Sequence, residues 1–176
     1  MDFKVGKKTL TNIAQKKRNK HSELDSWGGV GCFYSHLSVW QALLESGDDA
    51  WLVLEDDVTL LEPKFHHLLA TLQLPQYEFL MFDIDIFGKK VNVGHNMFRL
   101  STFWGAHAYL LNRSGAEKAV AYAKEIGVDM QLDYFIGHMA SKGIISGFSL
   151  NNKWFRQEQK RFSTDIQMLQ LKINTH

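Results

Sequence analysis

The sequence has little cysteine, little proline and almost no net charge. Its single cysteine, Cys32, cannot close an intramolecular disulfide, which favours a reducing compartment and makes the cytoplasm the expected location. With two prolines, at positions 63 and 75, and no Gly/Ser-rich linker, nothing divides the 176 residues into several domains. A net charge of +1 gives no strong field toward nucleic acid or a membrane surface, so no nucleic-acid partner is expected.

Long hydrophobic runs are also missing. A bilayer-spanning helix needs roughly 18 consecutive apolar residues, and no stretch approaches that length, so no transmembrane segment is expected. The opening MDFKVGKKTL lacks the apolar core of a secretory signal. What the chain does have is 45% hydrophobic and 22% charged residues, which is typical of a folded globular domain.

Basic residues gather near the start of the chain. Seven lysines and arginines lie between positions 4 and 20, with few acids among them. This pattern predicts a solvated, partly mobile basic arm over residues 1–27, followed by one folded domain over residues 28–176. A patch for phosphate-rich partners is the alternative, although no aromatic residues interleave the lysines as single-strand binding would require.

Helix and strand patterns alternate along the rest of the chain. Apolar residues at steps of three and four predict a helix after Gly28-Gly29 that ends near Ser46-Gly47. A second helix is expected to open at a capping box over 114–117 and to end at Gly127. Apolar runs predict strands over 51–54, 79–82, 103–111 and 144–148, and a further helix is expected over 132–141. The alternation predicts an α/β fold, with helices on the faces of a sheet.

Acidic residues follow directly after two predicted strands. Glu55, Asp56 and Asp57 end the first, and Asp83 and Asp85 end the second. Ligands of open α/β sheets bind at the carboxyl ends of strands. If the extended backbone continues through the triplet, the side chains of Glu55 and Asp57 face the same side and can share a cation. Oxygen ligands favour Mg²⁺ or Mn²⁺, and no Cys/His spacing in the sequence suggests a zinc site. A solvated turn is the alternative for this triplet.

Four other residues have both a structural and a functional interpretation. His36 lies on an apolar helix flank, which is typical of a hydrogen-bonded structural histidine, and Cys32 beside it is expected to be an inert, buried thiol. Asp129 and Asp133 follow a helix end. Either could cap the next helix or act as a reaction-centre carboxylate.

Two linked motifs resemble glycosyltransferase family 25. Residues 31–40, GCFYSHLSVW, are similar to the family's GC-x-x-SH helix, and residues 47–58, GDDAWLVLEDDV, are similar to its EDD-ending strand about twenty residues later. Residues 106–116, AHAYLLNRSGA, and 162–166, FSTDI, are similar to two further segments of the family. The family includes bacterial lipooligosaccharide galactosyltransferases and procollagen galactosyltransferases.

The resemblance implies a Rossmann-like, GT-A-like three-layer sandwich that binds a nucleotide sugar. It implies transfer of a hexose, galactose or glucose, to a glycan or protein hydroxyl, with inversion and with Mn²⁺ or Mg²⁺ as cofactor. The resemblance implies that Glu55 and Asp57 bind the metal. Ser35, His36 and Asp56 are implied to bind the donor, with Ser35 and His36 at a helix start. Asp129 or Asp133 is the implied catalytic base.

The chain also departs from the family pattern at its start. Family members usually open with a strand of the V-I-N-L-D-R type, and residues 1–27 contain no counterpart, so an N-terminally shortened fold is expected. The exposed sheet edge would favour a homo-oligomer. A catalytically inactive, glycosyltransferase-like binding or scaffold protein is the alternative to an active enzyme. Acceptor specificity is expected in a loop over residues 87–100.

Overall fold

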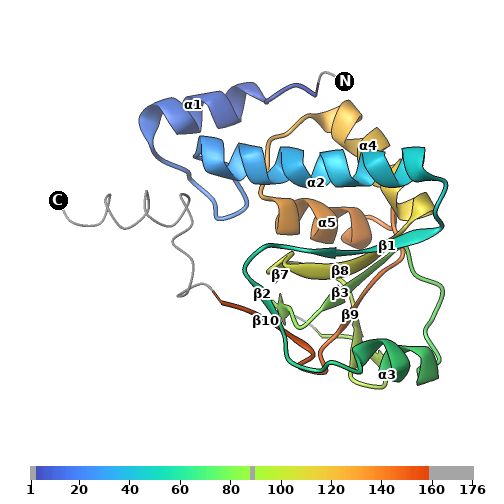
Figure 1. Ribbon diagram of the computed structural model, residues 1–176. Helices are drawn as coiled ribbons and strands as arrows, with labels where there is room; N and C mark the ends of the chain where they lie inside the picture. Colours follow the sequence, from blue (N-terminus) through green and yellow to red (C-terminus); the bar gives the residue numbers. More distant parts are fainter. Residues whose placement is uncertain (1–2, 88–89, 159–176) are drawn as a thin grey trace.

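A mixed six-stranded sheet forms the centre of the protein, with strand order β1-β8-β3-β9-β6-β5 (Figure 1). The computed structural model describes residues 3–87 and 90–158. The helices in these residues are α1 (Lys7–Gln15), α2 (Trp27–Ser46), α3 (Phe65–Thr71), α4 (Arg113–Ile126) and α5 (Leu132–Ser141). The strands are β1 (Ala50–Leu54), β2 (Val58–Leu60), β3 (Phe79–Phe82), β4 (Asp85–Ile86), β5 (Asn92–Gly94), β6 (Met97–Arg99), β7 (Phe103–Trp104), β8 (Ala108–Asn112), β9 (Gly147–Leu150) and β10 (Phe155–Gln157).

Alternating side chains of the sheet fill two hydrophobic cores. Phe79 and Met81 of β3 pack with α2, α4 and α5 on one face, whereas Leu80 and Phe82 pack with α3 and β10 on the other. This alternation follows from the period of two along a strand. The α/β prediction is confirmed as a mixed sheet with helices, consistent with a Rossmann-like sandwich, while the GT-A assignment stays a prediction.

Helix α2 lies where the apolar pattern predicts it, and a cap closes each of its ends. Ser26 accepts a hydrogen bond from the Gly29 N–H at 3.1 Å and caps the first turn. Gly47 takes a left-handed conformation (φ 83°) that closes the last turn. Val30, Phe33, Leu37 and Trp40 are buried in the hydrophobic core, and Leu44 is half-buried. Helix α5 has the predicted bounds.

Three predicted element boundaries are wrong, each for a local reason. The strand expected over 103–111 is broken into β7 and β8 because Gly105 adopts φ 95°. The strand expected over 144–148 begins at Gly147, since Ile145 is buried in the loop after α5 rather than in the sheet. Asn112, not Ser114, caps α4 by accepting from the Gly115 N–H at 2.8 Å.

The basic N-terminal segment packs on the domain instead of forming a free arm. Helix α1 lies on the outer side of α2 (Figure 1), with Thr9 and Asn12 buried and the lysines exposed. The Tyr34 hydroxyl donates to the Phe3 carbonyl at 2.5 Å, and Val5 forms a parallel bridge with Val128. The expectation of a mobile arm is therefore revised. The described residues before α2 contain no strand, only isolated bridges at Val5 and Glu23.

The close approach of α4 to β3 makes a testable stability prediction. A Cβ at Gly115 would lie 2.6 Å from the Glu78 carbonyl oxygen, whereas a Cβ at Gly31 of α2 would meet nothing within 4 Å. We expect Gly115→Ala to lower the unfolding free energy by about 1–3 kcal/mol through overpacking. Gly31→Ala should raise it by about 0.5–1 kcal/mol. Urea denaturation of both variants measures their unfolding free energies. Equal changes in the two variants would contradict the prediction.

No helix in residues 3–87 or 90–158 combines the length and apolar composition that a bilayer-spanning segment needs. The FSTDI motif lies outside the described residues.

Candidate active site

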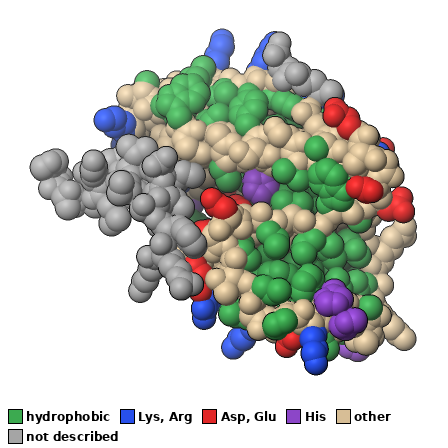
Figure 2. All heavy atoms as spheres, viewed as in Figure 1, with side chains coloured by type: hydrophobic (Ala, Val, Ile, Leu, Met, Phe, Trp, Pro, Cys, Tyr) green, Lys and Arg blue, Asp and Glu red, His purple; other side chains and the backbone are tan. Residues whose placement is uncertain are grey.

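The sheet topology brings the acidic strand ends to one edge. Strands β1 and β3 both pair antiparallel with β8, so they run in the same direction, and β9 runs parallel to β3. Their carboxyl ends therefore meet, with the start of β8 between them. The Glu55 N–H donates to the His107 carbonyl at 2.8 Å across this boundary. Figure 2 shows acidic side chains at the end of β1, where the chain turns toward β2.

Glu55 and Asp57 lie on the same side of this turn because one side chain holds both. Extended geometry stops at Leu54, yet the Gln157 side-chain amide donates to Glu55 Oε2 at 3.3 Å and to Asp57 Oδ2 at 3.1 Å. Gln157 reaches this position because β10 pairs with β2. Asp56 is exposed to solvent.

Asp57 is an under-satisfied buried carboxylate. Only 4% of its surface is exposed, and its Oδ1 has no hydrogen-bond partner among the described residues. Burial raises the pKa of Asp57, and the neighbouring charges of Glu55 and Asp56 raise it further against the hydrogen bond from Gln157. A bound cation would pair with Asp57 Oδ1 and would offset the repulsion between the neighbouring carboxylates, so these residues fit a divalent metal.

A buried hydrogen-bond chain orients Glu55. Trp40 Nε1 can only donate, and it donates to the Tyr109 hydroxyl at 2.9 Å. Burial raises the pKa of Tyr109, which keeps its proton, so that proton is donated to His36 Nδ1 at 2.6 Å. His36 Nε2 then carries the hydrogen that faces Glu55 Oε1 at 3.4 Å. His36 is thus a hydrogen-bonded structural histidine that also contacts Glu55, and its role toward a donor stays a prediction.

Cys32 and His36, one helical turn apart on α2, meet Glu55 in a mixed ligand group. Their ligating atoms all lie within 4.8 Å of one another. The sequence showed no zinc-like spacing because this group forms only when β1 packs beside α2. Burial raises the pKa of the Cys32 thiol to about 12, in agreement with an inert thiol. Asp57 and Glu55 offer the oxygen ligands expected for Mg²⁺ or Mn²⁺.

The expectation that Ser35 and His36 lie at a helix start is wrong. Helix α2 begins at Trp27, so both residues lie about two turns inside it, where backbone N–H groups are already bonded. Ser35 is exposed, and its hydroxyl donates to the Gly31 carbonyl at 3.0 Å. The side chains of Ser35 and His36 still line the same cleft as the acidic triplet.

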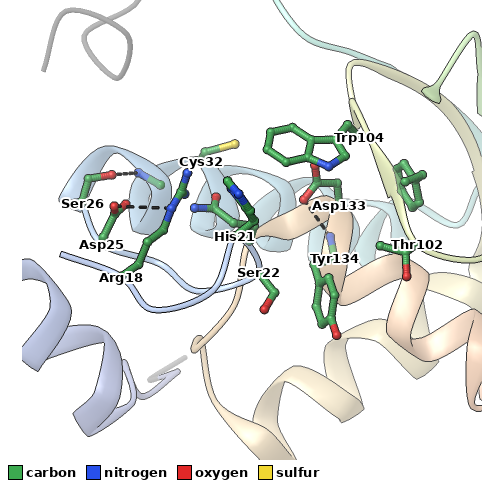
Figure 3. A pocket seen from close by; sticks show the side chains of 13 residues that line it. Arg18, His21, Ser22, Asp25, Ser26, Cys32, Thr102, Trp104, Asp133 and Tyr134 are labelled. Atoms are coloured by element: carbon green, nitrogen blue, oxygen red, sulfur yellow. Dashed lines mark hydrogen bonds and ion pairs between the residues drawn. The ribbon is translucent and has the colours of Figure 1, made fainter. Parts of the chain in front are cut away.

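The two candidate bases have different surroundings. Asp129 Oδ1 accepts from the Thr9 N–H at 3.2 Å and from the Thr9 hydroxyl at 2.7 Å, which caps the first turn of α1. Asp133 lines a cleft of about 530 Å³, where it lies beside Trp104 (Figure 3). Burial raises the pKa of Asp133, with a smaller contribution from the charge of Glu55.

Three neighbouring clefts share lining residues near this sheet edge. Cys32 lines both the Asp133 cleft and a cleft of about 550 Å³ over the acidic triplet. A third cleft, of about 690 Å³, shares Trp104 with the first and Gln157 with the second. Sequence reasoning missed Tyr109, Gln157 and Trp104 as site residues. Tyr109 could have been predicted, since it belongs to the AHAYLLN segment that resembles the family, but no local sequence pattern pointed to Gln157.

The fold and these clefts define an α/β protein with an acid-lined cleft at the carboxyl edge of its sheet. The sequence model described as "Glycosyltransferase family 25 (LPS biosynthesis protein)" matches residues 5–136. The chain belongs to glycosyltransferase family 25. It is also similar to the "Glycosyltransferase 25 family member" of Drosophila melanogaster, with 25% identity over 125 residues, which are 66% of this chain. The match spans only 20% of that relative.

Proposed function

We propose that the protein transfers a hexose from a nucleotide sugar to a hydroxyl of a glycan or protein, with a divalent metal and with inversion. The observation that carries this proposal is the buried, under-satisfied Asp57 beside Glu55 at the end of β1. Family membership supports the reaction class. Galactose and glucose are the proposed hexoses, and Mn²⁺ or Mg²⁺ the proposed metal.

Asp57 and Glu55 would hold the metal. Bound there, a divalent cation would offset the charge that develops on a departing diphosphate. Gln157 keeps the two carboxylates together, and His36 keeps Glu55 turned toward the cleft. Asp56, exposed beside them, is proposed to bind donor hydroxyls, together with Ser35.

Asp133 is proposed to accept the proton of the attacking hydroxyl. The acceptor oxygen forms a bond to the anomeric carbon while the bond from that carbon to the diphosphate oxygen breaks, and the diphosphate leaves with the electron pair. Inversion follows from attack opposite the leaving group. The raised pKa of Asp133 makes it a stronger proton acceptor than a solvated aspartate.

Asparagine substitutions separate the two candidate bases. Asp133→Asn should lower turnover at least about 100-fold, the loss typical of a missing general base. Asp129→Asn should leave turnover within a few-fold but lower the unfolding free energy by about 1 kcal/mol, because it weakens the α1 cap. Steady-state kinetics and urea denaturation test both variants. The reverse pattern would assign the base to Asp129.

Calorimetric titration with nucleotide sugars tests the function itself. We expect UDP-galactose or UDP-glucose to bind in the presence of Mn²⁺ and to be hydrolysed slowly without an acceptor. Loss of binding after chelation of the metal would support the metal role. No heat with any nucleotide sugar would instead favour the alternative, a binding or scaffold protein without activity. Homo-oligomerisation at the β1 edge stays a prediction, which sedimentation would check.

A further inference from the structure

The third cleft on the sheet edge, about 690 Å³ in volume, contains a histidine that has no partner. His107 lines this cleft and is only 5% exposed, yet both its ring nitrogens lack a hydrogen-bond partner among the described residues. A neutral imidazole ring offers one hydrogen-bond donor and one acceptor. Leaving such groups unpaired is costly, and a ligand that hydrogen-bonds with them would be favoured.

Exposed aromatic rings form a wall of the same cleft. Trp104 is 48% exposed and Phe87 is 49% exposed, and their rings meet edge-to-face with centroids 6.0 Å apart. Pairing of β4 with β7 places these rings beside each other, since Asp85 faces Trp104 in the register. A pyranose ring can pack its C–H groups on such a surface while its hydroxyls bond to polar groups at the rim.

The remaining groups argue against a metal in this cleft. Across residues 3–87 and 90–158, three ligating atoms come within 4.8 Å of one another only at Cys32, His36 and Glu55. Asp83 is already occupied, because it accepts backbone N–H groups of Trp154 and Phe155 at 2.7 and 2.9 Å. Of the two cationic side chains that line the cleft, Arg156 is paired with Glu158 at 2.5 Å and Lys153 is exposed.

We propose that the cleft lined by His107, Trp104, Phe87 and Asp85 is a saccharide subsite. The cleft shares Gln157 with the cleft over the acidic triplet and Trp104 with the Asp133 cleft, so it borders both. The ligand class rests on the proposed transfer reaction. The sugar can be the hexosyl group of the donor or the end of the acceptor, because both present the same ring chemistry.

Ligand-observed saturation-transfer NMR on the full chain tests this subsite. Methyl galactosides and methyl glucosides without nucleotide probe the acceptor source. UDP-hexose compared with UDP, both with Mg²⁺, probes the donor source. We expect saturation of hexose ring protons in at least one arm. His107→Leu and Trp104→Ala should each weaken that binding at least about tenfold.

Matched variants separate binding from folding. Trp27→Ala removes a tryptophan that is 61% exposed and does not line the cleft, and it should bind hexose like the wild type. His107→Leu should unfold at no lower urea concentration than the wild type, because it removes unpaired polar atoms. No saturation of hexose protons in either arm, or equal binding by all variants, would overturn the subsite. Glycoside binding without any UDP binding would keep the subsite and refute the proposed transferase.

Discussion

Asp57→Asn is expected to lower hexose transfer at least about 100-fold and to abolish the stabilisation by Mn²⁺, while making the metal-free protein more stable. The loss of transfer follows from removing a proposed metal ligand and the transition-state charge stabilisation it supports. The gain in stability follows from the cost of burying an ionised carboxylate with an unpaired oxygen. Opposite effects on activity and stability are typical of a site residue.

The sign of the pH dependence follows from the raised pKa of Asp57. The folded protein holds the Asp57 proton more tightly than the unfolded chain, so ionisation opposes folding. This penalty is absent below the unfolded pKa, grows between the unfolded and the folded pKa, and is complete above the folded one. The stability gain of Asp57→Asn should therefore be largest at neutral pH and vanish in acid.

Thermal unfolding with and without Mn²⁺ measures both effects. A ligand at about 100 times its dissociation constant stabilises the folded state by about 2.7 kcal/mol, so wild-type protein should melt at a higher temperature with Mn²⁺. Asp49→Asn is the control, since it removes the same charge at an exposed position before β1. Equal stabilisation by Mn²⁺ of Asp57→Asn and wild type would show that Asp57 does not bind the metal.

Tyr109→Phe should be among the most destabilising single-atom changes in the protein. Without its hydroxyl, Trp40 Nε1 and His36 Nδ1 both lose their buried partner. We expect the unfolding free energy to fall by about 2–6 kcal/mol, the sum for two unsatisfied buried groups. Transfer should fall as well, because His36 would no longer be held in the tautomer that faces Glu55.

A second tyrosine provides the comparison. The Tyr34 hydroxyl makes a hydrogen bond to the Phe3 carbonyl at a partly buried position, so Tyr34→Phe should cost only about 1 kcal/mol. Urea denaturation measures both variants, and a double-mutant cycle of Tyr109→Phe with His36→Gln measures the coupling within the chain. Additive effects of that pair would mean that Tyr109 and His36 do not act together.

Most elements of the fold could be predicted because their signals are local. The apolar period of α2, its closing Gly47 and the buried run of β3 depend on residues close in sequence, and the structure contains each of them. Predictions failed where tertiary packing competed with a local pattern. The lysines of the first segment are exposed as their charge suggests, but buried Thr9 and Asn12 still anchor that segment to the domain.

The candidate site divides in the same way. The sequence by itself determined that Glu55, Asp56 and Asp57 follow a strand, because an apolar run and the acids after it are contiguous. Only the tertiary structure decided that Gln157 joins two of these acids, that Asp129 caps a helix whereas Asp133 lines a cleft, and that His107 is buried without a partner. These relations depend on strand pairing and helix packing between residues far apart in the chain, and composition and periodicity carry no information about such distances.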